Sequence, residues 1–563
     1  MNNNRILKSA LAVSLAVIIG LSVWSFKTDQ KNFEVSKNLD IFYSLVRELN
    51  LFYVDDIKPE KLIRTGMDDM LETLDPYTVF IPESEMDEFK FMTTGEYAGI
   101  GAVISKHGNL IIVAEPYEGF PAQKSGLRAG DVFLEVDGKE VSKMKVSEVS
   151  EMLKGPAKKP INVKIQRPGE KRPFTLDIVR EEIQINPVTY YGMVDDHTGY
   201  LRLSSFTDGC ADIMKSAILD LRDKKGATKL VIDLRSNPGG LLGEAVKVVN
   251  LFVNHGQEVV STKGKVAQWD KTYRATEQPV DSLMPLIVLV NSGSASASEI
   301  VAGALQDLDR AVILGTRTFG KGLVQTTRDL SYNTKLKVTT AKYYIPSGRC
   351  IQALDYSHRN ADGSVGTIPD SLIHLFSTKS GRKVKDGGGV TPDYKIDQDT
   401  LSALAVKLVQ DFVIFDYATE FANVHKSIPS PKEFQYTDQM YADFIKFLKE
   451  KKFTYESKSE QSLKSLIVVA KKEHYYEGAQ HEFEAMEKGL TLNLDRDLKD
   501  FSDDIRQLIK DEIVSRYYYQ KGAIIASLDD DKEVKTAKNL LNKPDSYKLL
   551  LIPSKTIASK KSN

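Results

Sequence analysis

The sequence predicts a multidomain α/β protein, with a helical segment and a β-rich region before an α/β core and a helical region after it. The chain has 563 residues, which at about 150 residues per domain leaves room for roughly three to four domains. Apolar runs alternate with helical patterns over residues 183–345, which is typical of a layered α/β core. Turn signals separate short apolar runs over residues 95–180, and a charged helical pattern fills the chain from about residue 396.

The composition is that of a globular protein without a dominant charge. Hydrophobic residues make up 42% and charged residues 27% of the chain, which is ordinary. The 76 basic and 77 acidic residues leave a formal charge of −1, so there is no global electrostatic case for binding nucleic acid or an anionic membrane surface. The two cysteines, Cys210 and Cys350, exclude a disulfide scaffold and a cysteine-rich zinc module. They form either one disulfide or two unpaired thiols.

Residues 1–26 are predicted to be a signal peptide or a membrane anchor. Arg5 and Lys8 form a basic start, and residues 10–26 then run for seventeen positions without a charge. A buried core helix is the alternative, and the extreme N-terminal position disfavours it. Small residues suit cleavage, but Trp24 extends the apolar run, so we favour an uncleaved inner-membrane anchor. In either case the body is expected outside the cytoplasm, in the periplasm or anchored within the cell envelope.

Four further regions are expected along the chain. Residues 27–94 are predicted to be helical, and residues 95–182 to be β-rich with one short helix near residues 146–153. Residues 183–395 are predicted to form the α/β core, with a glycine-rich insertion at about 346–385, and residues 396–563 to be helical. The predicted core strands are residues 199–203, 229–234, 286–290 and 311–314, and the predicted core helices are residues 211–222, 243–252 and 298–308.

A run of tiny residues follows the predicted strand 286–290 and contains the serines Ser294, Ser296 and Ser298. Backbone N–H groups at the start of a helix are free donors that favour negative charge. A serine placed there can lie beside donors that bind an oxyanion. The alternative is a plain helix cap, with Ser296 or Ser298 as the N-cap and the other serines as loop residues. On this stretch alone, a serine nucleophile and a plain helix cap are equally well supported.

A serine nucleophile needs a base, and none of the eight histidines lies in a recognisable triad motif. Lys321 lies between two glycines in an otherwise apolar loop, where burial would lower the pKa of its ammonium group. A solvated surface lysine is the usual alternative. Gly239 and Gly240 follow another strand and let backbone N–H groups approach a ligand, although a tight turn explains them equally well. No phosphate-binding loop is present.

Together these stretches resemble the carboxyl-terminal processing proteases, tail-specific serine peptidases with a serine–lysine dyad. The motifs occur in family order over roughly residues 40–395, whereas the last 170 or so residues carry no such motif. The matching stretches are Leu74–Phe80 (LDPYTVF), Gly99–Ala102 (GIGA), Ser125–Asp131 (SGLRAGD), Leu234–Gly240 (LRSNPGG), Ser294–Glu299 (SASASE) and Phe319–Gln325 (FGKGLVQ).

The resemblance implies a crotonase-like protease core that needs no metal and no organic cofactor. It assigns Ser296 as the nucleophile and Lys321, 25 residues later, as the base. Gln325 would help to position the lysine, one helical turn or two strand pleats further on. The oxyanion donors would be the N–H of Ala297 and one from the turn at Gly239 and Gly240, with the choice between the two glycines left open.

The β-rich region resembles a PDZ domain that binds the C-terminal tails of envelope proteins. Residues 97–103 would form the carboxylate-binding loop and the strand to which an apolar tail adds, and residues 146–153 the helical wall beside it. The alternative for the loop is an ordinary glycine turn. The C-terminal region could cap the active site, bind an adaptor or drive self-association. The implied substrate-binding residues are Tyr97, Gly99, Ile100, Gly101, Ala102 and Val103.

Two other functions compete with a serine endopeptidase. One is a non-catalytic peptide-binding protein with PDZ and crotonase-like domains, and the presence of both Ser296 and Lys321 disfavours it. The other is an acyl-CoA enzyme with a crotonase-like core. Such enzymes commonly depend on carboxylates and lack the paired serine and lysine motifs.

Overall fold

The computed structural model describes residues 32–397, 401–455, 458–490 and 493–553. The predicted signal or anchor of residues 1–26 lies outside them. The chain divides into two compact units, which are described separately. The first comprises the residues up to Pro82 and residues 326–339, and the second comprises Glu83–Gln325 and the residues from Thr340. Among the described helices, none combines the length and the apolar character that a membrane span requires.

The first unit is not entirely helical. A helix covers residues 32–52, and α2 (Pro59–Glu72) begins with the proline at its first turn, where a missing N–H costs nothing. After α2 the Asp75 carboxylate accepts the N–H groups of Tyr77 and Thr78, which forms a turn. The chain then enters a strand, β1 (Val79–Ile81), which pairs antiparallel with the beginning of β18. The helical spacing upstream did not predict this strand.

The second unit begins with α3 (Met86–Thr94) and an antiparallel sheet in the order β3-β4-β5-β7-β8, so β3 is an end strand. Helix α5 packs against β3 and β5, and the sheet encloses its own apolar core. A separate pair, β2 with β9, precedes and follows this sheet in the chain. The bounds are η1 (Glu83–Glu85), β2 (Glu96–Gly99), β3 (Ala102–His107), β4 (Leu110–Pro116), α4 (Pro121–Lys124), β5 (Val132–Val136), β6 (Lys139–Glu140), α5 (Val146–Leu153), β7 (Pro160–Gln166), β8 (Phe174–Val179) and β9 (Glu181–Gln184).

The α/β core is a sheet in the order β10-β11-β12-β15-β16-β23, parallel except for the pair β10 and β11. Both faces are covered, which explains its continuous apolar strands. Leu230 and Ile232 point to the face covered by α6, α7 and α8, whereas Val231 points to the opposite face. The bounds are β10 (Val188–Met193), β11 (Thr198–Leu203), α6 (Cys210–Leu219), η2 (Asp220–Lys224), β12 (Lys229–Asp233), α7 (Leu242–Asn250), β15 (Leu286–Val290), α8 (Ala297–Asp307), β16 (Val312–Gly315) and β23 (Tyr394–Lys395).

The sequence patterns missed a second group of strands beside this core. Strand β13 (Glu258–Gly264) pairs with β14 (Lys271–Arg274) and with the end of β18 (Lys335–Tyr344), and β17 (Leu323–Asp329) pairs with β18. The insertion predicted to be irregular contains two short hairpins. Their strands and the 3-10 turn between them are β19 (Leu354–Arg359), β20 (Val365–Thr367), η4 (Asp370–Leu372), β21 (Leu375–Ser377) and β22 (Lys383–Lys385), and a separate 3-10 turn, η3 (Ala267–Trp269), connects β13 to β14.

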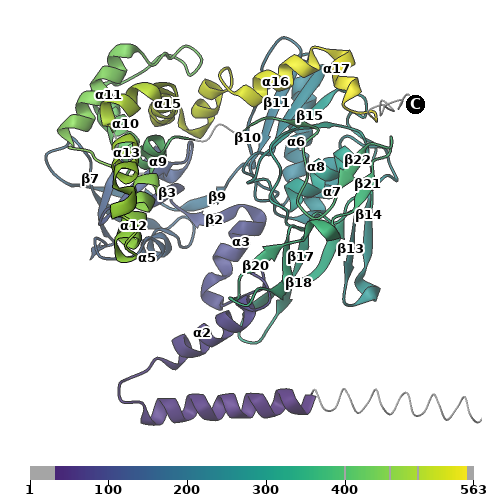
Figure 1. Cartoon of the computed structure of the whole chain (residues 1–563), viewed down its shortest axis with the longest axis horizontal. Helices are drawn as coiled ribbons and strands as arrows, with labels where there is room; N and C mark the ends of the chain where they lie inside the picture. The colour runs from purple at the N-terminus through teal and green to yellow at the C-terminus, as the bar shows by residue number, and fades with distance from the viewer. Residues whose placement is uncertain (1–31, 398–400, 456–457, 491–492, 554–563) are drawn as a thin grey trace, which may run out of the picture. The chain divides into compact units, whose positions relative to one another are not determined.

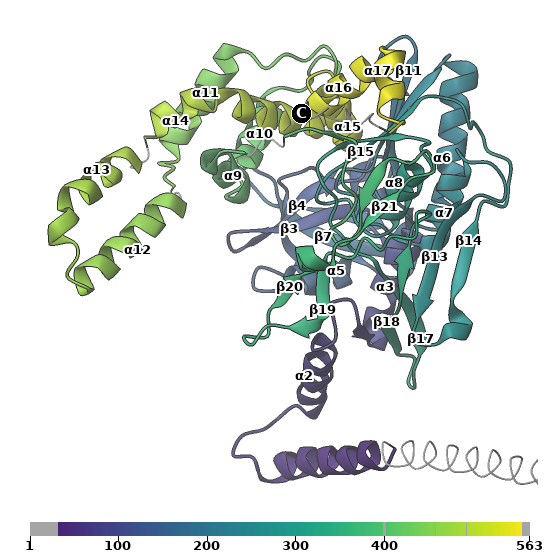
Figure 2. The same ribbon diagram turned by 45° about the vertical axis from the view of Figure 1, so that its right-hand side comes forward.

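The C-terminal region is helical, as predicted, and falls into two parts separated by a kink at Tyr519 (φ 55°, ψ −166°) inside α15. Residues 403–518, here called the helical lobe, enclose an apolar core to which Ala526, beyond the kink, also contributes. Residues 520–550, here called the C-terminal arm, cover the second face of the core sheet, where α16 contacts β12, β15 and β16 (Figures 1 and 2). The bounds are α9 (Ala403–Gln410), α10 (Val413–Val424), α11 (Asp438–Glu450), α12 (Lys458–Lys472), η5 (Glu477–Ala479), α13 (Gln480–Leu490), α14 (Leu494–Asp500), α15 (Ser502–Ser527), α16 (Lys532–Leu541) and α17 (Pro544–Leu549).

Candidate active site

The three serines of the run after β15 have different environments. Ser294 and Ser298 are fully buried, and each donates its hydroxyl to a backbone carbonyl: Ser294 to Leu234 at 2.8 Å and Ser298 to Asn237 at 2.9 Å. Ser296 is only partly buried and is the N-cap residue of α8. The alternative in which Ser298 caps the helix is therefore wrong, because Ser298 already lies within its first turn and bonds to the neighbouring turn.

The backbone of Ser296 is strained, with φ 55° and ψ −111°. A residue with a side chain pays about 1–3 kcal/mol for such a conformation, and strain of this kind concentrates at functional sites. A serine nucleophile at a sharp turn from a strand to a helix has its hydroxyl exposed in the same way. The strand is β15 and the helix is α8, every residue of which is buried.

The Glu299 carboxylate joins Ser296 to Lys321 through their backbones. One oxygen, Oε2, accepts the N–H of Ser296 at 2.9 Å and the N–H of Lys321 at 2.8 Å. The other, Oε1, accepts the Thr318 hydroxyl at 2.6 Å and the N–H of Gly320 at 2.7 Å. Burial raises the pKa of Glu299 to about 7, although these four hydrogen bonds act to lower it. The carboxyl group thus fixes both ends of the site and titrates near neutrality.

Tyr343 makes a second link between the same two residues. Its hydroxyl lies 2.7 Å from the carbonyl oxygen of Lys321 and 3.2 Å from that of Ser296. The ring is 1% exposed, and burial followed by the charge of Glu299 raises the pKa of its hydroxyl well above the ordinary value. No sequence pattern indicated Tyr343, and Glu299 appeared only as the last residue of the Ser294–Glu299 motif, without an assigned role.

The loop that carries Lys321 is shaped by its flanking glycines. A Cβ on Gly320 would lie 2.4 Å from the Cβ of Ala353, and one on Gly322 would lie 2.7 Å from the backbone nitrogen of Gln352. Neither clash involves a flexible side chain, so both positions require glycine. Lys321 itself is partly buried. Gln325 is the third residue of β17, so the spacing between the two residues is that of a strand rather than of a helix.

The turn at Gly239 and Gly240 lies against the serine loop. A Cβ on Gly239 would lie 2.9 Å from the Ser296 Cβ and 2.9 Å from the Ala297 nitrogen. The N–H of Gly239 is already bonded to the Asn237 side-chain oxygen at 2.9 Å. Within the described residues, the N–H groups of Gly240 and Ala297 donate no hydrogen bond. The structure therefore distinguishes the two glycines: Gly240 keeps a free donor and Gly239 does not.

The six residues predicted to bind a tail extend from β2 through the turn at Gly101 to the start of β3. Tyr97 and Gly99 belong to β2, whereas Ala102 and Val103 begin the end strand β3. Gly101 has φ +74°, and a Cβ there would lie 2.6 Å from Phe120. The remaining residue, Ile100, is buried in the core of this sheet.

The Tyr97 hydroxyl lies near the donors predicted to hold a tail carboxylate. Burial raises the pKa of this hydroxyl, whereas the backbone N–H groups of Gly101 and Ala102 act to lower it.

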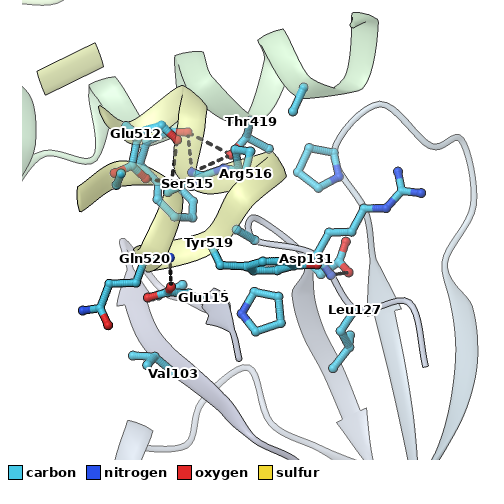
Figure 3. A pocket seen from close by; sticks show the side chains of 18 of the residues that line it. Val103, Glu115, Leu127, Asp131, Thr419, Glu512, Ser515, Arg516, Tyr519 and Gln520 are labelled. Atoms are coloured by element: carbon cyan, nitrogen blue, oxygen red, sulfur yellow. Dashed lines mark hydrogen bonds and ion pairs between the residues drawn. The ribbon is translucent and has the colours of Figure 1, made fainter. Parts of the chain in front are cut away.

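A cavity of about 400 Å³ lies between this sheet and the helical lobe, beside direct contacts such as that of His107 Nε2 with the Asp416 carboxylate at 3.0 Å. The Val103 side chain lines it from β3, and Tyr519 lines it from the kink in α15 (Figure 3). The Glu115 carboxylate of β4 accepts the N–H of Gln520 at 3.1 Å, which caps the helix that resumes after the kink. Sequence reasoning missed this contact because its partners are 405 positions apart.

The two cysteines do not form a disulfide. Cys210 is a buried free thiol, and Cys350 is a partly buried one. The sequence left open either one disulfide or two unpaired thiols, and the structure contains two unpaired thiols.

Three family models match the chain in the order of its folded parts. They are PDZ domain at residues 112–167, Peptidase family S41 at 197–358, and "Probable PDZ-protease, C-terminal helical domain" at 404–541. A carboxy-terminal-processing protease of Bartonella bacilliformis is 40% identical over 340 residues, which cover 60% of this chain and 75% of the relative. The chain belongs to the carboxy-terminal-processing proteases of peptidase family S41.

A second relative agrees with this family. A relative named "Probable CtpA-like serine protease", from Staphylococcus aureus, is 33% identical over 416 residues, covering 73% of this chain and 80% of the relative. The solved structure of a photosystem II D1 C-terminal processing protease is 31% identical and covers 64% of this chain and 88% of that one, with a TM-score of 0.35. The prediction of a serine protease with a PDZ domain and a helical C-terminal region is confirmed. The PDZ domain implies that the protein binds peptides.

Proposed function

We propose that this protease cleaves exported proteins through a serine–lysine dyad made by Ser296 and Lys321. The observation that carries the proposal is the double link between their backbones through Glu299 and Tyr343. Of the three serines in the run, only Ser296 combines partial exposure with the strained conformation of a nucleophile. Gln325, on the strand that follows the lysine loop, would help to orient the amine.

In the proposed reaction the Ser296 hydroxyl attacks the carbonyl carbon of the peptide while the neutral Lys321 amine takes its proton. The carbonyl oxygen becomes an oxyanion, which the N–H groups of Ala297 and Gly240 stabilise. The ammonium group then protonates the departing amine as the C–N bond breaks, leaving an ester on Ser296. Water hydrolyses this ester with the lysine again acting as the base.

The dyad is tested by the pH dependence of kcat/KM together with three variants. Ser296→Ala is expected to abolish cleavage, and Lys321→Arg to do the same because arginine does not give up its proton. The wild-type rate should rise with pH, with a midpoint well below the pH of about 10.4 at which a free lysine titrates. Lys263→Arg, at an exposed lysine of β13, is the matched control. A folded Lys321→Arg enzyme with near wild-type kcat/KM would place the base elsewhere.

We further propose that the PDZ domain selects substrates by an apolar C-terminal tail. The tail would add to the open edge of β3, and its carboxylate would bind the N–H groups of the loop at Ile100 and Gly101. Amidation of the substrate's C-terminus should then slow cleavage, and Gly101→Trp should do so as well. Equal rates for free and amidated substrates would remove the tail site from the mechanism.

The proposed location is the cell envelope, with the body of the protein outside the cytoplasm. The support is the basic start and uncharged apolar run of residues 1–26. Fractionation of cells that express the full chain or a chain lacking residues 1–26 tests it, and cytoplasmic recovery of the full chain would contradict it. Mass spectrometry of envelope proteins with and without the active enzyme would identify substrates by their altered C-termini. Binding of an adaptor and self-association through the C-terminal region stay predictions.

A further inference from the structure

Arg235 begins the turn that leads from β12 to Gly240, and its guanidinium lies among three carboxylates. Nη2 is 2.6 Å from Asp233 at the end of β12 and 2.8 Å from Asp531. Nη1 is 3.3 Å from Glu533. Asp531 and Glu533 belong to the start of α16, almost 300 positions away in the sequence. The C-terminal arm thus touches the base of the turn proposed to supply an oxyanion donor.

The cluster is largely withdrawn from water. The Asp233 side chain is fully buried and also accepts the Tyr200 hydroxyl at 2.6 Å, and the side chains of Arg235 and Asp531 are 17% and 16% exposed. Burial acts to raise the pKa of Asp233, but the charge and hydrogen bonds of Arg235 prevail and lower it. A charge pair in such surroundings is screened far less than one at the surface.

A short chain of bonds runs from Arg235 to the serine loop. Ser236 has φ +57° and donates its N–H to the Asn291 side chain at 2.8 Å. The carbonyl oxygen of Asn237 accepts both the Ala295 N–H at 3.0 Å and the Ser298 hydroxyl at 2.9 Å. A displacement of Arg235 would therefore move the turn relative to α8, whose first N–H is the other proposed oxyanion donor.

The anchor on the helix side is firm. Asp531 uses one carboxylate oxygen to cap α16, accepting the Val534 N–H at 2.9 Å, and the other to bind Arg235. Val534, Ala537 and Leu541 are buried against the core sheet. The position of the carboxylate is thus set by packing that is independent of the active site.

We propose that Asp531, assisted by Glu533, is a positioning residue for catalysis: through Arg235 it holds the turn at Gly240 in register with Ala297 and Ser296. The inference rests on the proposed function, in which the N–H groups of Gly240 and Ala297 bind the oxyanion. A misplacement of about 1 Å can cost roughly a hundredfold in rate, so the arm would contribute to kcat without contacting the substrate.

The experiment compares Asp531→Asn, Glu533→Gln and the double variant with the wild type. Asparagine and serine are as good N-caps as aspartate. Asp531→Asn therefore removes the charge and keeps the cap, and Asp531→Ser removes the charge with a different capping side chain. Asp530→Asn is the matched control, because Asp530 faces Lys510 and Lys535 instead of Arg235. The measurements are kcat and KM on a quenched peptide, the inhibition constant of a peptide aldehyde, and the melting temperature.

The expected result for the double variant is a fall in kcat of about tenfold to a hundredfold, with KM within twofold of the wild type. The aldehyde forms a tetrahedral adduct on Ser296, so its inhibition constant should rise by a similar factor. The melting temperature should stay within about 2 °C, because the loss is one of alignment and not of folding, and Asp530→Asn should match the wild type.

Wild-type kcat and aldehyde inhibition in the double variant would overturn the inference. So would losses that follow a fall in melting temperature in both Asp531→Asn and Asp531→Ser, since the role would then be structural. The proposed function fails separately, if Ser296→Ala remains active. An inactive Ser296→Ala beside a fully active double variant would leave the dyad intact and remove only the role of Asp531.

Discussion

The C-terminal helices contact the rest of the second unit in two places of different chemistry. The C-terminal arm covers the core sheet with a continuous apolar surface in which Leu541 and Val534 are at most 2% exposed. The helical lobe meets the PDZ domain around a cavity whose lining includes Asp511. Glu115 and Arg516 line the same cavity (Figure 3). Dense apolar packing resists displacement, whereas the PDZ contact contains a cavity and titratable side chains.

We therefore expect the arm to stay fixed on the core sheet and the contact between the helical lobe and the PDZ domain to be adjustable, although α15 takes part in both. Helix α15 contributes to both contacts, and its kink at Tyr519 lines the PDZ cavity. We expect the PDZ domain to shift against the helical lobe more easily than α16 leaves the sheet, where Asp531 lies beside Arg235. The four predictions below test the contrast.

Apolar burial should dominate the stability of the arm. Leu541→Ala is expected to cost about 2–5 kcal/mol, because it removes a fully packed side chain and leaves a cavity. Val103→Ala, at the PDZ cavity, should cost less than about 1 kcal/mol, because Val103 is already 39% exposed. Urea unfolding of both variants measures the difference. Equal losses would mean that the PDZ contact is as well packed as the arm.

The PDZ contact should weaken as pH rises, and the arm should not. Burial raises the pKa of Asp511 from 3.8 to about 7, with Glu512 and Asp530 adding to it and Lys510 opposing it. The folded chain then keeps a proton that the unfolded chain loses, so stability is greatest at low pH. It falls by up to about 1.4 kcal/mol per pH unit as pH rises from about 4 to 7.

Asp511→Asn should reduce this slope by the share that Asp511 contributes, because its amide does not titrate, whereas Glu299 and Glu115, whose pKa values burial also raises, keep their shares. Melting curves between pH 5 and pH 8 measure the effect, and Asp503→Asn, at an exposed carboxylate of the same helix, is the control. An unchanged slope in Asp511→Asn would assign the titration to another group.

Much of the core and of the site follows from local patterns in the sequence. The apolar runs at residues 229–234 and 286–290 predicted β12 and β15 to within a residue, because strands buried on both faces carry continuous apolar residues. Strands β13 and β18 were missed because their pairing joins segments about 80 positions apart and their exposed faces carry no simple alternation. The serine and lysine of the proposed dyad were found through short motifs.

The supports of the site could not be predicted in this way. The choice between Gly239 and Gly240 depends on where one side chain, that of Asn237, finds its donor. The link between Arg235 and Asp531 spans 296 positions, and nothing in either segment indicates the other. Long-range polar contacts are set by the packing of whole elements, which a local sequence pattern does not contain.

At the kink, a glycine variant should be more stable than an alanine variant, which is the reverse of the order in an ordinary helix. Tyr519 has φ 55° and ψ −166°, a region almost restricted to glycine that costs other residues about 1–3 kcal/mol. Tyr519→Gly should therefore be more stable than Tyr519→Ala by about 1 kcal/mol or more, although both lose the ring. At Lys521, two residues further into the helix, alanine should be better than glycine by about 1 kcal/mol. The same order at both positions would show that the kink is not strained.

The smallest effect is expected at the cap that joins the PDZ domain to α15. Glu115→Gln keeps an oxygen for the N–H of Gln520 but removes the negative charge near the start of the resumed helix, which is worth about 0.3–1 kcal/mol. Amide exchange at Gln520 should then accelerate roughly twofold to fivefold, whereas exchange in α16 should be unchanged. Val103 lies opposite Glu115 on the strand proposed to receive the tail, so a bound peptide should alter the same amide. Faster exchange in α16 would contradict the contrast, because it would show that the arm moves with the PDZ domain.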